Sequence, residues 1–191
     1  MDIGIIGLPG SGKTTLLNAL TRAQAQTGGY AAASRPNLGV LKVPDPRLDT
    51  LTVLMKSART VQAEISFVDI PGQPPEMGRS QGFQGEYLLQ VSQADALLLV
   101  LRAFRSPTQP EPDPARDLES MEMELTLADL GLIERRLQKL EDSAKAARAT
   151  ERERIARETV LMAELKAALE AGTPLRALDL SSEARKAIST F

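Results

Sequence analysis

The chain of 191 residues has no cysteine and no histidine, and aromatic side chains make up only 3% of it. Without cysteine, disulfides, thiol catalysis and thiolate metal sites are excluded. Without histidine, the usual general base and the commonest metal ligand are missing. Any catalysis must therefore rest on positioning, on Mg²⁺ and on charge stabilisation, and phosphoryl transfer is a reaction that these can support.

Long apolar runs and a strong net charge are also lacking. The longest apolar run, residues 96–101, is far too short to span a bilayer. No basic segment precedes an apolar one at the N-terminus, so we expect no signal peptide, no membrane partner and a cytoplasmic location. A formal net charge of −2 gives no global attraction to nucleic acid. With so few aromatic residues, we expect no direct sequence-specific nucleic-acid binding.

A phosphate-binding motif stands at residues 7–14, which read GLPGSGKT and fit the pattern G-x-x-x-x-G-K-[ST]. An apolar run before it predicts a buried strand, and a leucine-rich run after it predicts a helix. Glycines let backbone N–H groups converge on phosphate oxygens at the positive end of the helix dipole. We expect Lys13 to span the β- and γ-phosphates and the Thr14 hydroxyl to ligate Mg²⁺. The residues expected to bind the nucleotide are Leu8, Pro9, Gly10, Ser11, Gly12, Lys13, Thr14 and Thr15.

A second motif, Asp69-Ile-Pro-Gly72, follows a predicted strand over residues 64–69. P-loop nucleotidases need a carboxylate here behind Mg²⁺, and a glycine whose N–H meets the γ-phosphate. Gln73 stands where a glutamine would orient the attacking water, so Lys13, Gly72 and Gln73 are the candidate catalytic residues. Two other readings stay open: Asp69 as an ordinary turn residue, and Gln73 as a solvated loop side chain.

The order of segments predicts an α/β fold of the P-loop NTPase type, resembling a G domain, with a mostly parallel sheet and helices on both faces. We count four strands. Residues 1–106 form the expected nucleotide-binding domain, a partial G domain. Residues 115–175 form the expected antiparallel coiled-coil hairpin, either projecting into solvent or packed on the sheet. Residues 176–191 are expected to return toward the missing part of the G domain. The positions expected in the hairpin seam are Leu130, Ile133, Leu137, Leu140, Ala144, Ala147, Ile155, Met162, Leu165 and Leu169.

The guanine-reading motif N-K-x-D is missing. The chain has only two asparagines, Asn18 in the first predicted helix and Asn37 in a Pro-Asn turn, and neither opens such a motif. Without that buried carboxylate, the site has no evident means of strongly preferring guanine. ATP and GTP both remain candidates.

Several of these segments resemble the Obg-like ATPase family, also called YchF. The resemblance rests on the phosphate-binding loop, PNLGV at 36–40, PDPRLD at 44–49, FVDIPG at 67–72, ELTLADL at 124–130 and LRALDL at 175–180. It implies a P-loop domain interrupted by a coiled coil, Mg²⁺-dependent hydrolysis of ATP with GTP used less well, and association with ribosomes or translation factors.

The chain departs from the family pattern at three positions. Gly10 stands where the family has an asparagine implicated in monovalent-cation binding, Gln73 replaces a hydrophobic residue, and Ala33 aligns with the first-switch threonine, next to Ser34. The family also continues into further strands, an N-x-x-E base-recognition motif and a TGS domain. The sequence does not decide whether this is a piece of a longer protein or a short form that needs a partner segment.

The function predicted from the sequence is slow, Mg²⁺-dependent hydrolysis of ATP or GTP that controls a contact with the ribosome or a translation-related protein. Arg79 and Arg105 are candidate charge donors, although surface arginines are common. One alternative is a nucleotide-binding interaction module that does not hydrolyse. Another is a small-molecule kinase, against which the Asp69 loop and the lack of an arginine-rich lid both count.

Overall fold

A computed structural model describes residues 1–21, 37–72, 85–107 and 110–188. The described residues divide into two compact units, residues 1–118 without the gaps and residues 119–188. Each unit has a hydrophobic core of its own.

The first unit is built on a four-stranded sheet with the order β2-β3-β1-β4. Its strands are β1 (Asp2–Ile6), β2 (Asn37–Lys42), β3 (Glu64–Asp69) and β4 (Ala96–Leu99). β1 pairs in parallel with β3 and with β4, whereas β2 pairs antiparallel with β3. The prediction of a mostly parallel sheet of an α/β fold is therefore confirmed. The shared carboxyl ends of β1 and β3 bring the two sequence motifs together, because parallel strands end at the same edge.

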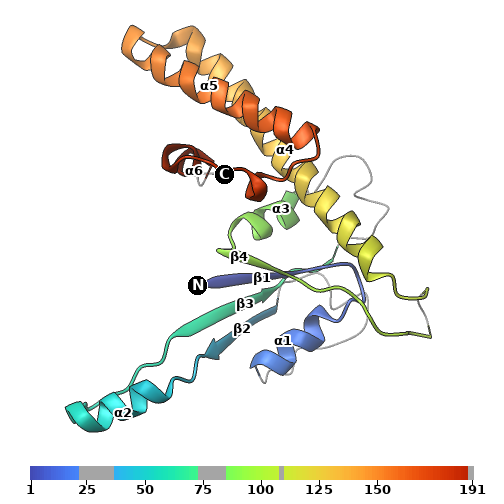
Figure 1. Cartoon of the computed structure of the whole chain (residues 1–191), viewed down its shortest axis with the longest axis vertical. Coiled ribbons are helices and arrows are strands. Elements are labelled where there is room, and N and C mark those ends of the chain that lie inside the picture. Colours follow the sequence, from blue (N-terminus) through green and yellow to red (C-terminus); the bar gives the residue numbers. More distant parts are fainter. Residues whose placement is uncertain (22–36, 73–84, 108–109, 189–191) are drawn as a thin grey trace. The chain divides into compact units, whose positions relative to one another are not determined.

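One face of this sheet is covered by helix α1 (Lys13–Thr21) (Figure 1). Ile5 and Leu17 are fully buried in the core between them, and Phe67 is 5% exposed. Gly39 on β2 permits the close approach of the helix, because a Cβ there would lie 2.5 Å from Cγ2 of Thr21. Side chains alternate between the two faces of each strand, so only every second residue of β2 and β3 reaches this core.

The other face of the sheet meets helix α3 (Gly85–Ser92), which lies across the strands from α1 in Figure 1. Tyr87 and Val91 of α3 are buried. Beneath them β1 carries Gly4, where a Cβ would lie 3.2 Å from that of Ala94 just after the helix. Helices therefore cover both faces, as the sequence predicted.

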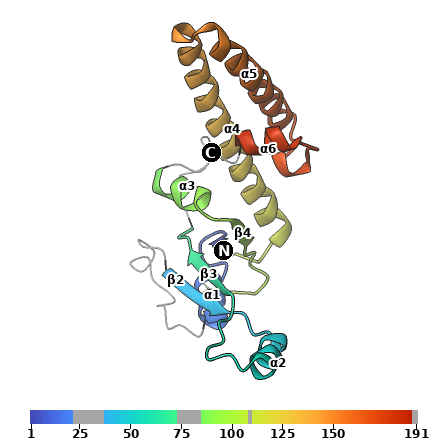
Figure 2. The same ribbon diagram turned by 90° about the vertical axis from the view of Figure 1, so that its left-hand side faces the viewer.

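Helix α2 (Pro46–Met55) lies at the end of an arm formed by β2 and β3 and buries none of its residues (Figures 1 and 2). Its ends are fixed locally. The Asp45 carboxylate accepts from the Arg47 backbone N–H at 3.0 Å, and Lys56 closes the helix in the left-handed region. Its apolar residues face solvent, with Val53 79% and Leu54 72% exposed.

Because Leu54 lies in solvent, we expect Leu54→Gln to change the free energy of unfolding by less than about 0.5 kcal/mol. The matched variant is Leu17→Ala, which removes a fully buried leucine from the core under the sheet and should cost about 2–5 kcal/mol. Urea denaturation of both variants measures the difference. A loss at Leu54 as large as that at Leu17 would mean that α2 is packed against something in the folded chain.

The second unit contains most of helix α4 (Pro114–Ala146) and helix α5 (Ala149–Glu170), joined by Ala147 and Arg148. Figures 1 and 2 show the two helices side by side in a hairpin. Every position that the sequence placed in the seam lies in their shared core, from the fully buried Met162 to partly buried positions such as Leu137. The coiled-coil geometry itself stays a prediction.

Ion pairs join α4 and α5, and the C-terminal segment packs on the same core. Arg136 pairs across the hairpin with Glu158, and Lys166 with Glu134 at 2.8 Å. The 3₁₀ turn η2 (Leu175–Ala177) and helix α6 (Ser182–Ile188) follow, and their apolar side chains pack on the same core. Among the described residues, no helix is both long enough and apolar enough to cross a membrane.

Candidate functional site

The loop between β1 and α1 carries the candidate site. Three of its glycines adopt positive φ angles, Gly7 at 148°, Gly10 at 76° and Gly12 at 99°. Such angles are readily available only to glycine, which explains why the motif has glycine there. A Cβ on Gly7 would lie 2.4 Å from the carbonyl oxygen of Val100. The tight turn delivers the chain into α1 at Lys13, so the positive end of the helix dipole points to the loop.

Lys13 is held over this loop by its own backbone. Its Nζ donates to the carbonyl oxygens of Gly7 and Leu8, both at 3.0 Å, and the side chain is 7% exposed. Burial lowers the pKa of Lys13 below the ordinary lysine value, and the nearby Asp69 carboxylate partly opposes this shift. An ammonium carries three donors, so at most one remains for an anion while both carbonyls are bound.

Asp69 ends β3 next to the start of α1. Its Oδ2 accepts a hydrogen bond of 2.6 Å from the Thr14 hydroxyl, and the amide of Asn37 lies 3.4 Å from the same oxygen. Its other oxygen, Oδ1, is buried and has no hydrogen-bond partner among the described residues. A buried carboxylate oxygen without a partner is costly. This oxygen is therefore a place where a cation or its hydration shell would be stabilising.

Gly72 lies directly against the loop. A Cβ at this position would be 2.7 Å from the Gly7 carbonyl oxygen and 3.0 Å from both Lys13 Nζ and the Pro9 nitrogen. Only a residue without a side chain fits there. The second motif thus brings the backbone of Gly72 close to the lysine ammonium.

Two residues near the loop were not among the predicted site residues, although both lie in the segment after β4. A Cβ on Gly12 would lie 3.7 Å from Cε1 of Phe104, whose ring is 53% exposed. Arg102 is buried and donates to the carbonyl oxygens of Phe104 at 3.2 Å and Pro110 at 2.7 Å. The signal available in the sequence was Arg102 and Phe104 shortly after a strand, in a chain with few aromatic residues.

The remaining predicted site residues differ in their placement. Ser11 is buried, and its hydroxyl has no partner among the described residues, whereas Pro9, Gly10 and Thr15 are exposed. Arg105 is a surface residue that pairs with Glu111 at 3.2 Å. Gln73, Arg79, Ala33 and Ser34 lie outside the described residues.

Asn37 requires a correction. The sequence interpretation placed it in a turn after Pro36, but it is the first residue of β2 and lies opposite Asp69 in the register. Sheet pairing with β3 outweighs the local preference of a Pro-Asn pair for a turn, because pairing supplies hydrogen bonds along six consecutive residues.

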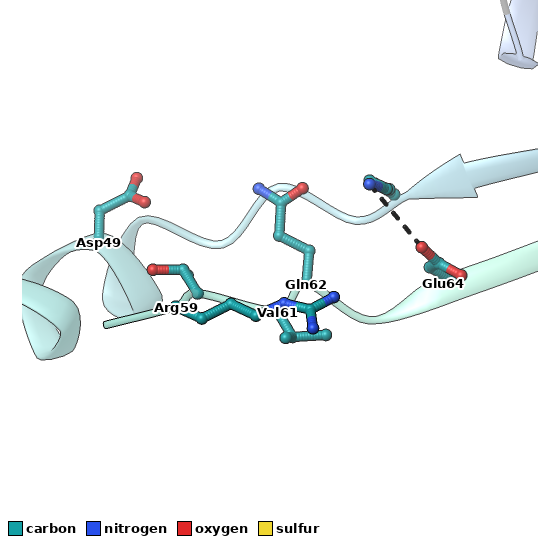
Figure 3. A pocket seen from close by; sticks show the side chains of 7 residues that line it. Asp49, Arg59, Val61, Gln62 and Glu64 are labelled. Carbon is teal, nitrogen blue, oxygen red and sulfur yellow. Dashed lines mark ion pairs between the residues drawn. The ribbon is translucent and has the colours of Figure 1, made fainter. Parts of the chain in front are cut away.

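A separate pocket of about 210 Å³ lies between α2 and the adjoining ends of β2 and β3 (Figure 3). It is lined by Lys42, Asp49, Arg59, Thr60, Val61, Gln62 and Glu64. Its two cations and two carboxylates balance, and Lys42 pairs with Glu64 at 3.9 Å. Lys42 and Glu64 face each other at the opposite end of the strand pair from Asn37 and Asp69. This pocket is therefore separate from the phosphate-binding loop.

Comparison with known proteins agrees with this geometry. Residues 2–133 match the sequence profile of a family described as 50S ribosome-binding GTPase. The chain is 33% identical over 193 residues to the ribosome-binding ATPase YchF of Bacillus subtilis, covering 98% of this chain and 52% of that one. It is 35% identical over 190 residues to the ribosome-binding ATPase YchF of Escherichia coli O157:H7, with coverages of 97% and 51%.

The YchF GTPase of Schizosaccharomyces pombe, a solved structure, superimposes with a TM-score of 0.76 and 26% identity. The match covers 100% of this chain and 52% of that one, so the chain spans about half the length of the relatives it matches. The sequence profile, the sequence relatives and the fold all agree, and the chain belongs to the YchF family of P-loop GTPases.

Proposed function

We propose that this chain binds ATP or GTP together with Mg²⁺ and hydrolyses the nucleotide slowly. The observation that carries the proposal is the hydrogen bond of 2.6 Å between Thr14 and Asp69, beside a buried Asp69 oxygen without a partner. A threonine hydroxyl has one proton and two lone pairs. It can therefore donate to Asp69 and still offer a lone pair to Mg²⁺.

Four groups have separate proposed roles at the nucleotide: the loop amides, Lys13, Gly72 and Gln73. The loop amides and Lys13 would hold the phosphates, because backbone N–H groups at a helix N-terminus and an ammonium are suited to bind a polyanion. Gly72, whose backbone lies close to the Lys13 ammonium, would offer its N–H to the γ-phosphate. Gln73, directly after it, is proposed to orient the attacking water. With no histidine in the chain, and with Arg105 paired to Glu111 at the surface, we expect turnover to be slow.

The donor set fits Mg²⁺. Thr14 and Asp69 are the residues that would hold it, and hydroxyl and carboxylate oxygens are the ligands that this ion prefers. When bound, Mg²⁺ neutralises negative charge on the phosphate oxygens. The Lys13 ammonium is also positively charged. Lys13 and Mg²⁺ would therefore together neutralise the negative charge of the phosphates.

The site gives no reason to expect a strong preference for guanine. Neither asparagine belongs to an N-K-x-D motif, since Asn18 lies within α1 and Asn37 starts β2. Phe104 offers a half-exposed ring next to Gly12, against which any base could stack. Stacking is tolerant of base identity. We therefore propose that ATP and GTP both bind, and that the hydrogen-bonding groups that would choose between them lie outside this site.

The partner is proposed from the relatives. The curated relatives are named ribosome-binding ATPases, and the matching profile describes ribosome-binding GTPases. We propose that the nucleotide state of this chain controls a contact with the ribosome or a translation-related protein in the cytoplasm. The helical hairpin, which has its own core and a highly charged surface, is the proposed contact element.

Replacing Asp69 by asparagine tests the proposal. The shape and one hydrogen-bond acceptor are kept, but the charge that faces Mg²⁺ is lost. We expect Mg²⁺-dependent phosphate release from ATP and GTP to fall about 10- to 100-fold. The control is Asp49→Asn on α2, which removes a carboxylate at the distant pocket and should leave release unchanged.

Measurements on the parent protein distinguish a nucleotide hydrolase from an interaction module that binds nucleotide without hydrolysing it. If the parent binds a triphosphate in calorimetry but releases no phosphate above the Lys13 and Asp69 double variant, the chain is an interaction module. If the parent binds neither ATP nor GTP, the proposed function is wrong.

A further inference from the structure

Asn37 is held opposite Asp69 by the sheet itself. The antiparallel register between β2 and β3 runs from the pair Asn37 and Asp69 to the pair Lys42 and Glu64. Directly opposed residues bring their side chains onto the same face of a sheet. The Asn37 amide reaches to 3.4 Å from Oδ2 of Asp69, a long hydrogen bond. The position of this amide is thus fixed by six paired residues and not by a loop.

The two oxygens of Asp69 have different surroundings. Oδ2 receives the Thr14 hydroxyl from α1 and the Asn37 amide from β2, whereas Oδ1 is buried without a partner among the described residues. Two donors from two separate elements, both aimed at one oxygen, restrict rotation of the carboxylate about its last bond. The direction of Oδ1 is therefore fixed as well.

We propose that Asn37 is a positioning residue for the metal site: its amide holds Asp69 so that Oδ1 stays directed at the Mg²⁺ bound through Thr14. The inference rests on the proposed function, since it concerns the same site. Partners that orient a carboxylate at a metal typically contribute about 10- to 100-fold to metal affinity. Asn37 does not touch the nucleotide in this assignment, so it acts only through Asp69.

The residue type follows from the chemistry. A neutral amide donates to Oδ2 without adding charge, whereas an aspartate at this position would repel Asp69 and offer no proton. A leucine would leave Thr14 as the only donor to Oδ2, and the Thr14 hydroxyl is also the proposed ligand of Mg²⁺. The amide thus secures the carboxylate independently of the residue that binds the metal.

The test uses the whole chain with Asn37→Leu, which has nearly the same size, and Asn37→Asp, which has the same shape but no donor. Calorimetry measures the affinity for a non-hydrolysable ATP analogue in Mg²⁺ and in EDTA, and electron paramagnetic resonance measures Mn²⁺ binding to the complex with the analogue. We expect Mn²⁺ affinity to fall about 10- to 100-fold. Affinity for the analogue in EDTA should stay within about twofold, because the phosphate-binding loop is untouched.

The matched control is Leu38→Ala, at the next position of β2, where the side chain is 68% exposed and points to the other face of the sheet. It should leave Mn²⁺ affinity unchanged. If Asn37→Leu does not fold, as judged by circular dichroism, Asn37→Asp supplies the answer, because it preserves the size of the side chain at the strand start.

The outcomes separate this inference from the proposed function. If the parent binds the analogue equally well with Mg²⁺ and with EDTA, and takes up no Mn²⁺, the proposed metal site itself is wrong. If the parent takes up Mn²⁺ and both Asn37 variants match it, the proposed function stands and the role of Asn37 is wrong. A variant that loses analogue affinity equally in Mg²⁺ and in EDTA would show a merely structural role, which also overturns the inference.

Discussion

Replacing Lys13 by methionine should lower the affinity for ATP and GTP about 100- to 1,000-fold while leaving the protein folded. A hydrogen bond to a charged group contributes about 1.5–3 kcal/mol, and the ammonium would serve two phosphates. A loss of about 3–4 kcal/mol corresponds to that range. Isothermal calorimetry in Mg²⁺ measures it directly. The matched control is Lys42→Met. Lys42 ends β2, far from the loop, and its side chain is 68% exposed. We expect this variant to bind ATP and GTP as tightly as the parent does.

Lys13→Met should not lose stability, and this distinguishes a lysine that binds nucleotide from one that stabilises the fold. Burial lowers the pKa of Lys13, so the folded state holds its proton less tightly than the unfolded state does. In the pH window between the lowered folded pKa and the unfolded value of 10.5, the unfolded state binds more protons, and stability therefore rises with pH. Lys13→Met removes this dependence.

Urea denaturation of parent and Lys13→Met, repeated at several pH values up to 10.5, measures the effect. The stability difference between the two proteins should shift in favour of the parent as pH rises. A parent whose stability relative to the variant fell across this window would contradict the assigned direction of the pKa shift. Unchanged nucleotide affinity in Lys13→Met would contradict the site itself.

Gly7→Ala should strongly destabilise the first unit. The added Cβ would stand 2.4 Å from the Val100 carbonyl oxygen and 2.9 Å from Ser11 Oγ, at a φ of 148° that alanine avoids. Overpacking costs about 1–3 kcal/mol and an unfavourable backbone angle adds about 1 kcal/mol. We expect a loss of about 2–4 kcal/mol in the free energy of unfolding and weaker nucleotide binding, since the loop must shift to relieve the clash.

Tyrosine fluorescence during urea denaturation is a suitable probe, because both tyrosines precede residue 119 and the chain has no tryptophan. Gly131→Ala is the control. Gly131 lies inside α4, in the second unit, and its added Cβ would meet nothing closer than 3.7 Å, so this variant should leave the tyrosine-detected transition of the first unit unchanged. A Gly7→Ala protein as stable as the parent would mean that the loop does not pass β4 as closely as described.

Local patterns in the sequence predicted most of the elements. The structure contains the strand before the phosphate-binding loop, the leucine-rich helix after it and the strand over residues 64–69, as predicted. These predictions succeeded because glycine, proline and apolar periodicity act within a few residues of themselves. The helical seam succeeded for the same reason, since the spacing of Ile133, Leu140 and Met162 repeats along single helices.

Local sequence patterns did not predict for every helix and strand which of its faces is buried by other parts of the chain. The leucine spacing along α2 is compatible with a buried face, yet Leu54 and Val53 lie in solvent at the end of the β2–β3 arm. Burial depends on which other element approaches, and that is decided by chain segments distant in sequence. Asn37 shows the same limit, because a Pro-Asn pair favours a turn locally and only pairing with β3 makes it a strand.

By itself, the sequence determined that this protein has a phosphate-binding loop, a carboxylate after a strand and two long helices, because each of these is written in residues close together along the chain. Only the tertiary structure decided that the side chains of Thr14 and Asn37 both donate to one oxygen of Asp69, and that the Phe104 ring lies next to Gly12. Parallel pairing of β1 with β3 and with β4 brings together residues dozens of positions apart. No local pattern records which strands become neighbours, since that choice belongs to the packing of the whole sheet.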